Sequence, residues 1–172
     1  MSTVQGPNRT ASETISRLIA THQTALLRLC FAYLHDEALA EDAVQETFLK
    51  AYRSLHRFRS DASEKSWLTA IAMNTCRDLR KSGWFRFVDR TVTPEQLPDP
   101  ACAITPQDGE VTASVMNLPI RLREAVLLYY YQDMTLDETA QVLGISHQAV
   151  SDRLSRARKK LKTVLERSDL HA

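Results

Sequence analysis

The sequence predicts an all-α protein of two small helical domains, the second a helix-turn-helix, joined by a flexible acidic linker. Apolar residues recur at helical spacing on both sides of the linker, and the β-branched alternation typical of strands is not found. Within the linker the helical period is lost, acidic residues accumulate, and four prolines remove backbone donors: Pro94, Pro98, Pro100 and Pro106. We expect the domains at residues 12–88 and 115–168 and the linker at residues 89–114.

Composition narrows the functional classes. The 172 residues are 44% apolar and 25% charged, which is typical of a folded protein. No apolar run approaches the ~20 residues that span a bilayer, and the polar start lacks the apolar stretch of a signal peptide, so we expect a cytoplasmic protein without membrane insertion. The three cysteines lack metal-ligand spacing: Cys30 and Cys76 fall on apolar helix faces, and Cys102, in the linker, is expected to be a passive thiol.

The first domain is expected to hold three helices. One runs over residues 12–34, and Asp36 then offers an N-cap for the next, in which apolar residues recur at i, i+4, i+7 and i+11 from Val44. The third runs from about Glu64 to Lys81, and Gly83 is its expected stop.

The second domain is expected to hold three further helices. Pro119 suits the first turn of a helix that reaches about Tyr131. Thr135 and Glu138 form a capping-box pattern for a short helix that ends at Gly144. The last and longest helix carries an apolar stripe: Val150, Leu154, Ala157, Leu161 and Leu165.

The turn between the last two helices has the spacing of a helix-turn-helix. Ala140, Gly144 and Val150 lie four and six residues apart, which allows a close helix crossing, a left-handed turn and packing of the second helix on the first. The helix after this turn exposes polar side chains near its start and cations further on, as a helix in the major groove does. The alternative is a solvated basic face on an ordinary bundle helix. The exposed residues are Ser146, His147, Gln148, Ser151, Asp152, Arg153, Arg156, Arg158, Lys159, Lys160 and Lys162.

A second basic block lies in the first domain. Residues 50–90 carry ten basic and four acidic side chains, interleaved with aromatic residues. Cations that follow a backbone and aromatic faces that stack bases are typical of a site for unpaired nucleic acid. Trp67 falls on the inward face of its helix and is expected in the core. For Phe58, in the irregular segment before that helix, core and stacking roles remain equal alternatives.

The helix before this block carries an acidic surface. Its members are Asp36, Glu37, Glu41, Asp42, Gln45 and Glu46. Because acidic groups repel DNA, this surface either faces solvent or binds a protein.

No catalytic or metal-binding constellation is found in the sequence. It has no Gly-rich phosphate loop, no HExxH motif and no paired cysteine ligands, and its five histidines are scattered. We therefore expect neither an enzyme nor a bound metal or cofactor.

Two stretches resemble a known family. The second conserved region of bacterial RNA polymerase sigma factors resembles residues 36–81, which include EDAVQETFLKAYRSLHRFRS and WLTAIAMNTCRDLRK. Their fourth region resembles residues 118–161, which include TLDETAQVLGISHQAVSDRLSRARKKL. With only a connector between the two, the chain resembles the two-domain extracytoplasmic-function (ECF) group over about residues 14–166.

The resemblance implies a promoter-specificity subunit with three binding surfaces. The helix that docks on core RNA polymerase would use Asp42, Gln45, Glu46, Phe48, Leu49 and Tyr52. The melted minus-ten element, with one base flipped into a pocket, would be held by Phe58, Arg59, Ser60, Asp61, Lys65, Asn74, Arg77, Arg80 and Lys81. The minus-thirty-five duplex would be read by Ser146, His147, Gln148, Ser151, Asp152, Arg153, Arg156, Arg158 and Lys159.

The resemblance also implies an anti-sigma factor, through which the nucleoid-associated chain would be tethered at the membrane. The promoter sequence stays open, because Asp152 cannot bond guanine acceptors but could accept from a cytosine amine. The alternative function is a stand-alone helix-turn-helix transcriptional regulator, which would bind a duplex operator without polymerase.

Overall fold

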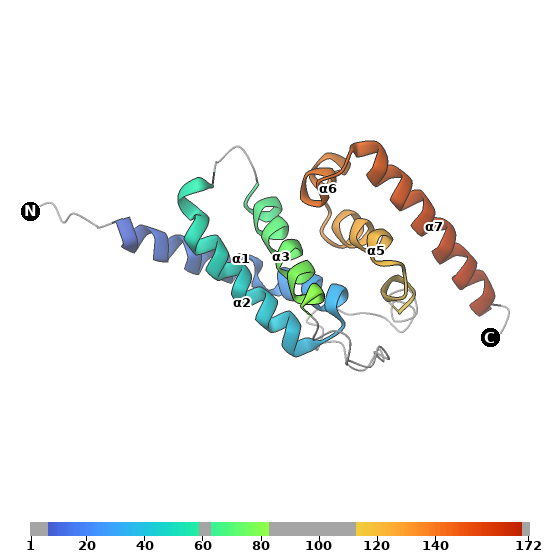
Figure 1. The fold of residues 1–172 in the computed structure, drawn as a ribbon, viewed down its shortest axis with the longest axis horizontal. Coiled ribbons are helices and arrows are strands. Elements are labelled where there is room, and N and C mark those ends of the chain that lie inside the picture. The colour runs from blue at the N-terminus through green and yellow to red at the C-terminus, as the bar shows by residue number, and fades with distance from the viewer. Residues whose placement is uncertain (1–6, 59–62, 83–112, 170–172) are drawn as a thin grey trace, which may run out of the picture.

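The computed structural model describes residues 7–58, 63–82 and 113–169, and every regular element within these ranges is helical (Figure 1). The first module contains α1 (Pro7–Leu34), α2 (Glu37–Ser54), the short 3-10 helix η1 (Leu55–Arg57) and α3 (Glu64–Lys81). The second module, residues 113–169, contains α5 (Ile120–Val126), the π-helical turn η4 (Leu127–Tyr131), α6 (Leu136–Leu143) and α7 (His147–Asp169). The predicted all-α class and its helix-turn-helix are confirmed.

Side-chain caps set the helix starts in the first module. The Asp36 carboxylate accepts from the backbone N–H of Leu39 at 2.8 Å, as the sequence predicts. Ser63 caps α3 in the same way, through the backbone N–H of Ser66 at 3.0 Å. The α1 helix begins at Pro7, five residues before its expected start, because proline is tolerated in a first helical turn.

The first module is held together by helix α1, which packs against both α2 and α3. Leu18, Leu29 and Leu68 are almost wholly buried between these helices. Cys30 and Cys76 are fully buried, as predicted, and a hydrogen bond to Cys30 together with burial raises the pKa of the Cys76 thiol. These two thiols therefore behave as core groups.

The first helix of the second module departs from its predicted form. Instead of one α-helix to Tyr131, α5 ends at Val126 and a π-helical turn follows, in which the Gln132 N–H donates to the carbonyl of Leu127 at 3.0 Å. Such π-helical segments occur mostly as single turns inside α-helices, and this one spans Leu127–Tyr131. Leu127 and Leu128 are both buried, while Tyr130 remains about half exposed.

The helix-turn-helix follows the predicted local rules. Thr135 Oγ1 accepts from the Glu138 N–H at 3.1 Å, and Glu138 accepts from the Thr135 N–H at 2.8 Å, which completes the capping box. Gly144 adopts φ 65°, a left-handed conformation that an L side chain rarely takes. Ser146 then caps α7 through the Ala149 N–H at 3.1 Å.

The two modules lie against each other. Helix α3 packs against α6 (Figure 1), and α1 packs against η4. The buried apolar side chains form one continuous cluster through both modules. Residues 113–116 form a helical turn in which Ser114 is buried, so the end of the predicted linker belongs to the second module. The rest of the linker, including Cys102, lies outside the described residues.

Candidate nucleic-acid interface

The outer face of α7 is opposite its apolar stripe. Val150, Leu154 and Ala157 are buried, which turns the residues midway between them towards solvent. The side chains that the structure exposes there include Gln148, Asp152, Arg156 and Lys159, and Arg158 is exposed on the flank. This row starts with polar groups and ends with cations.

Asp152 is not isolated on this face. Its Oδ1 accepts a hydrogen bond from Gln148 Nε2 at 3.1 Å, one helical turn earlier. The bond leaves the Gln148 carbonyl oxygen available as an acceptor, and it fixes the amide relative to the helix. The first two turns of α7 therefore present a coupled polar pair ahead of the cations.

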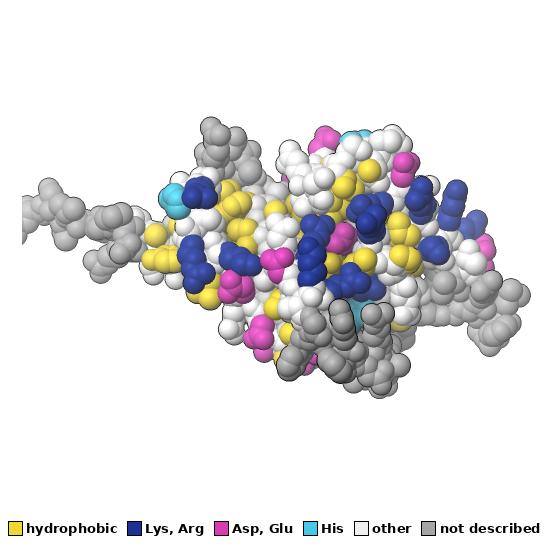
Figure 2. All heavy atoms as spheres, in the orientation of Figure 1, with side chains coloured by type: hydrophobic (Ala, Val, Ile, Leu, Met, Phe, Trp, Pro, Cys, Tyr) yellow, Lys and Arg dark blue, Asp and Glu magenta, His cyan; other side chains and the backbone are white. Residues whose placement is uncertain are grey.

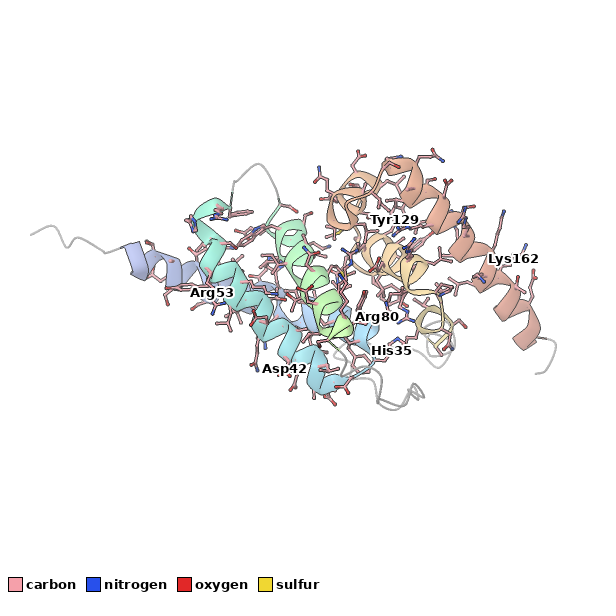
Figure 3. The ribbon with its side chains drawn as sticks, in the orientation of Figure 1. His35, Asp42, Arg53, Arg80, Tyr129 and Lys162 are labelled. Carbon is pink, nitrogen blue, oxygen red and sulfur yellow. The ribbon has the colours of Figure 1, made fainter. Side chains whose placement is uncertain are left out.

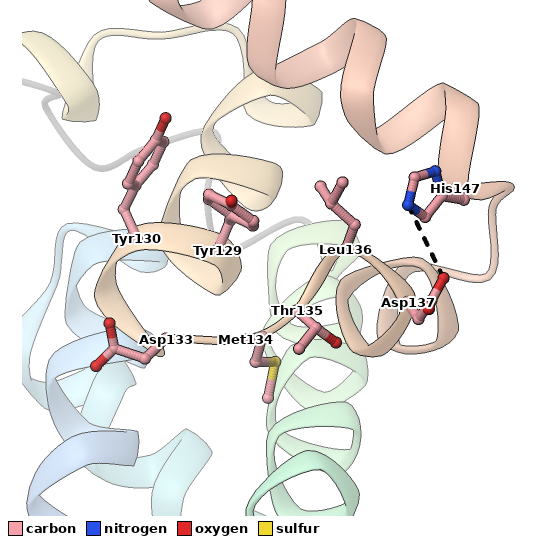
Figure 4. A pocket seen from close by; sticks show the side chains of 8 residues that line it. All are labelled: Tyr129, Tyr130, Asp133, Met134, Thr135, Leu136, Asp137 and His147. Atoms are coloured by element: carbon pink, nitrogen blue, oxygen red, sulfur yellow. Dashed lines mark ion pairs between the residues drawn. The ribbon is translucent and has the colours of Figure 1, made fainter.

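His147 borders a hollow of about 580 Å³ on the second module (Figure 4). Tyr129, Tyr130, Leu136 and Asp137 are among its lining residues. The His147 imidazole lies 4.0 Å from the Asp137 carboxylate across the turn of the motif. A neighbouring helix thus supplies the acidic partner for one predicted DNA contact.

The predicted DNA contacts on α3 differ in exposure and in whether they bond to the second module. Asn74, Arg80 and Lys81 are exposed. Lys65 instead donates to the backbone carbonyl of Gln132, and Arg77 donates to Glu124 at 3.0 Å, so both reach into the second module. Arg59, Ser60 and Asp61, predicted for the minus-ten element, lie outside the described residues.

Phe58 and Trp67 form one aromatic pair. Their ring centroids are 4.7 Å apart with the planes tilted by 36°. Trp67 is partly buried against the hydrophobic core, in line with its predicted inward position. Phe58 is half-buried beside it at the edge of the segment that precedes α3.

Arg153 is less exposed than the other cations of α7 that are predicted to contact DNA. Its guanidinium lies 3.8 Å from the Glu124 carboxylate, and only 20% of its side chain is exposed. Ser151 is half-buried on the opposite flank of the helix. Arg153 therefore faces the junction between the modules.

Sequence reasoning missed the groups that hold these cations. Tyr33 and Glu124 are both buried, and the Tyr33 hydroxyl donates to Glu124 at 3.1 Å. Burial, followed by the charge of Glu124, raises the pKa of Tyr33 to about 12. Burial alone would lower the pKa of Arg77, but the hydrogen bond and charge of Glu124 more than offset it and raise this pKa. The available signal was the position of Glu124, two residues after Leu122 and directly before the apolar Ala125 and Val126.

Most of the residues predicted to dock on polymerase lie on one exposed face of α2. Asp42, Gln45, Leu49 and Tyr52 are exposed along one face, with exposed fractions of 51% for Leu49 and 43% for Tyr52. Glu46 is partly exposed and lies 4.0 Å from Lys50. Phe48 is only 7% exposed and packs into the core, because it falls at the inner edge of the helix. The Phe48 side chain is therefore not part of the exposed face, and polymerase docking by the other predicted residues stays a prediction.

Charge is unevenly distributed on the face shown in Figure 2. Lys and Arg side chains extend across both modules, with acidic side chains between them near the middle. Among the described residues, no group of three or more His, Cys, Asp or Glu could hold a metal ion. In the same ranges, no helix is long and apolar enough to cross a membrane.

Each of the two modules matches a known protein family. The Sigma-70 region 2 family matches residues 18–86, and the Sigma-70 region 4 family matches residues 109–161. Together the two matches span most of the chain. They coincide with the helices that carry the α2 and α3 surfaces and with the helix-turn-helix.

Individual relatives cover nearly the whole chain. The chain is 31% identical to the ECF RNA polymerase sigma factor SigM of Mycobacterium tuberculosis, over 87% of this chain and 76% of SigM. It is 30% identical to the RNA polymerase sigma factor CnrH of Cupriavidus metallidurans, over 87% of this chain and 85% of CnrH. The solved structure of CnrH in complex with the cytosolic domain of CnrY matches with a TM-score of 0.71, 30% identity and coverage of 92% of this chain and 94% of that chain. With both conserved regions in order and full-length relatives of this kind, the chain belongs to the ECF group of RNA polymerase sigma factors.

Proposed function

We propose that this sigma factor divides its work among three surfaces of the described helices. The α2 face around Asp42 docks on core polymerase, the exposed end of α3 holds the melted minus-ten strand, and the outer face of α7 reads the minus-thirty-five duplex. In this division of work the chain positions polymerase and DNA, and the chemistry of initiation belongs to the polymerase. The stand-alone regulator is not favoured, because both sigma regions are present in one chain.

The order of side chains on the outer face of α7 is the main observation that supports this proposal. A helix that presents polar groups first and cations later can place the former at base edges and the latter at phosphates. Gln148 and Asp152 occupy the first position, and Arg156 and Lys159 occupy the second. The buried stripe on the opposite side fixes this orientation.

The α2 face has the composition of a protein-docking site. Large apolar side chains, Leu49 and Tyr52, are exposed beside the acidic Asp42, and exposed apolar patches rimmed by polar residues mark interaction sites. An acidic surface also keeps this helix away from DNA. Figure 3 shows Asp42 on the outer side of the first module, where a large partner can approach.

An anti-sigma factor is the proposed inhibitory partner. CnrH, which is 30% identical, was solved in complex with the cytosolic domain of CnrY. We infer that this chain binds an equivalent protein in the cytoplasm, where polymerase and the nucleoid are also found, and that such a partner would tether it at the membrane.

The test is transcription with purified core polymerase. The wild-type chain is expected to give defined start sites on a genomic promoter library only when core polymerase is present. Asp42→Arg should reduce polymerase association at least about tenfold, since it reverses a charge in a desolvated contact. Glu13→Arg, an equal charge reversal at an exposed site on α1, is the matched control. Equal binding by wild type and Asp42→Arg would remove the α2 assignment, and tight operator binding without polymerase would favour the regulator.

A further inference from the structure

Two polar side chains at the start of α7 are joined to each other. Gln148 is the second residue of the helix, and Asp152 lies one turn later. Gln148 Nε2 donates a hydrogen bond to Asp152 Oδ1 at 3.1 Å, and both side chains are exposed. Helix α7 packs on α5 and α6 and runs along the outer edge of the second module (Figure 1). The pair therefore faces outwards on the helix that we assign to the major groove.

The orientation of the Gln148 amide follows from the chemistry of its partner. An ionised carboxylate only accepts hydrogen bonds, so the amide must turn its NH2 group, and not its carbonyl oxygen, towards Asp152. One of the two N–H bonds of the amide is used in this contact. The carbonyl oxygen Oε1 and the second N–H bond remain for a ligand. Gln148 therefore presents one acceptor and one donor in a fixed relation.

These remaining groups of Gln148 match the major-groove edge of adenine. Adenine presents its N6 amine as a donor and its N7 atom as an acceptor, and a glutamine amide bonds both at once. Guanine presents two acceptors there, O6 and N7, so it lacks the donor that the amide oxygen requires. Gln148 in this orientation therefore favours adenine over guanine.

Asp152 presents only acceptors to the groove. Its Oδ1 is occupied by Gln148, which leaves Oδ2 for an outside donor. A carboxylate oxygen in the major groove accepts from the amine of cytosine or adenine, and it repels the O6 and N7 acceptors of guanine. Asp152 therefore favours a base that carries an amine and disfavours guanine.

The spacing of the two side chains suits neighbouring base pairs. Four residues of an α-helix rise about 6 Å, and successive base pairs of B-form DNA are about 3.4 Å apart. Gln148 and Asp152 can therefore reach bases one or two steps apart. Arg156 and Lys159 follow on the same face, where cations bond phosphates without reading sequence.

A purely structural role for the pair makes a different prediction. Glutamine and aspartate at positions i and i+4 stabilise a helix, and an acidic group near a helix start interacts favourably with the helix dipole. The start of α7 is also held by Ser146, which accepts from the Ala149 N–H at 3.1 Å, and by the buried Val150 and Leu154. Removal of a merely structural pair would weaken binding to every sequence equally, so base preference separates the two roles.

We propose that Gln148 and Asp152 select bases that carry an amine in the minus-thirty-five element, with Asp152 also orienting Gln148. Gln148 bonds an adenine at one base pair, called the first pair. Asp152 bonds the amine of a cytosine or an adenine one or two steps away, at the second pair. Guanine is rejected at both pairs. The inference rests on the proposed function and adds to it the kind of base that two residues select.

The test measures base preference with the polymerase holoenzyme. A promoter found by transcription with core polymerase provides the parent duplex, each base pair of its minus-thirty-five element is varied in turn, and binding is followed by fluorescence anisotropy. The wild-type chain should bind adenine over guanine by about 5- to 150-fold at the first pair, which is the discrimination of a good bidentate contact. At the second pair it should favour cytosine or adenine over guanine.

Three variants separate the roles of the two residues. Gln148→Ala should remove the preference for adenine at the first pair and leave the second pair unchanged. Asp152→Asn places an NH2 group where Oδ2 lies, so the ratio of cytosine to guanine binding at the second pair should fall about fivefold or more. The asparagine carbonyl oxygen can still accept from Gln148, so the first pair should keep its preference. Asp152→Ala removes the orienting acceptor and should weaken the preference at both pairs.

Matched controls use exposed sites of the same module. Gln141→Ala on α6 and Glu166→Gln near the end of α7 repeat the two kinds of change away from the pair, and both should leave base preference unchanged. Circular dichroism establishes that each variant is folded.

The outcomes distinguish this inference from the proposed function. Guanine preferred at the first or second pair, or equal weakening of all sequences by the three variants, would overturn it. A change confined to the second pair in Asp152→Ala would remove the orienting role. Defined start sites whose base preferences depend on neither Gln148 nor Asp152 would refute this inference alone. If the wild type gives no polymerase-dependent start sites, the proposed function fails and this inference fails with it.

Discussion

Replacing Arg156 with alanine tests the assignment of the α7 outer face. Arg156 is exposed one helical turn after Asp152, on the face opposite the buried stripe. If its guanidinium neutralises one phosphate, the logarithm of the binding constant should depend less steeply on the logarithm of salt concentration. The expected decrease in slope is about 0.9 for one contact on B-form DNA.

The size of the effect follows from this slope. Between about 50 and about 200 mM salt the concentration changes fourfold, so one phosphate contact accounts for a factor of about 3.5 in affinity over that interval. Arg156→Ala should therefore weaken binding about 3.5-fold more at the lower concentration than at the higher one. Base preference should stay unchanged, because a phosphate contact carries no sequence information.

The assay is a salt titration of promoter binding by the polymerase holoenzyme, followed by fluorescence anisotropy. Arg28→Ala is the matched control, since Arg28 is exposed on α1 and its loss changes net charge equally. A salt slope that Arg156→Ala leaves unchanged, or that Arg28→Ala lowers as much, would refute the reasoning that places this face against the phosphates.

Three further predictions concern stability. Thr135→Ala removes the hydroxyl that caps α6 and should lower the free energy of unfolding by about 1 kcal/mol, measured in urea. Leu154→Ala, at a site only 1% exposed, should lower it by about 2–5 kcal/mol, with the exposed Lys159→Ala nearly neutral. Burial and the nearby charge of Arg123 lower the pKa of His35 from 6.5 to about 4. The unfolded chain therefore binds more protons than the folded chain between these values, and stability should decrease as pH falls from about 6.5 to about 4. His35→Asn, which suits the left-handed φ of 58°, should flatten this dependence in urea titrations at each pH.

Local features of the fold could be predicted from the sequence. The Asp36 cap, the Thr135–Glu138 capping box and the left-handed Gly144 each depend on residues within a few positions of one another. The α7 outer face was predictable for the same reason, because the buried stripe fixes the opposite side.

Features that depend on distant residues could not be predicted in the same way. The hydrogen bond between Tyr33 and Glu124 joins positions 91 residues apart, and that between Lys65 and Gln132 joins positions 67 apart. Neither helical period nor charge pattern indicates which polar groups will meet over such separations. The π-helical turn was missed because helical periodicity does not distinguish it from a continued α-helix. Phe48 was predicted on the docking surface, although its side chain faces inward.

The buried Glu124 carboxylate and an external phosphate compete for one guanidinium group, that of Arg77. Arg77 donates to Glu124 at 3.0 Å, so a phosphate can bond this guanidinium in its place only when that contact breaks. Surface phosphate contacts weaken as salt increases, whereas a buried pair is screened much less. Rising ionic strength should therefore favour the Arg77–Glu124 pair over DNA binding by the free protein. In the proposed function polymerase removes this disadvantage, because docking would fix the separation of the modules and turn two weak DNA contacts into one joint contact at high effective concentration. The near-neutral net charge of +1 gives the free chain little general attraction for DNA. Promoter affinity is therefore expected to depend on the polymerase holoenzyme.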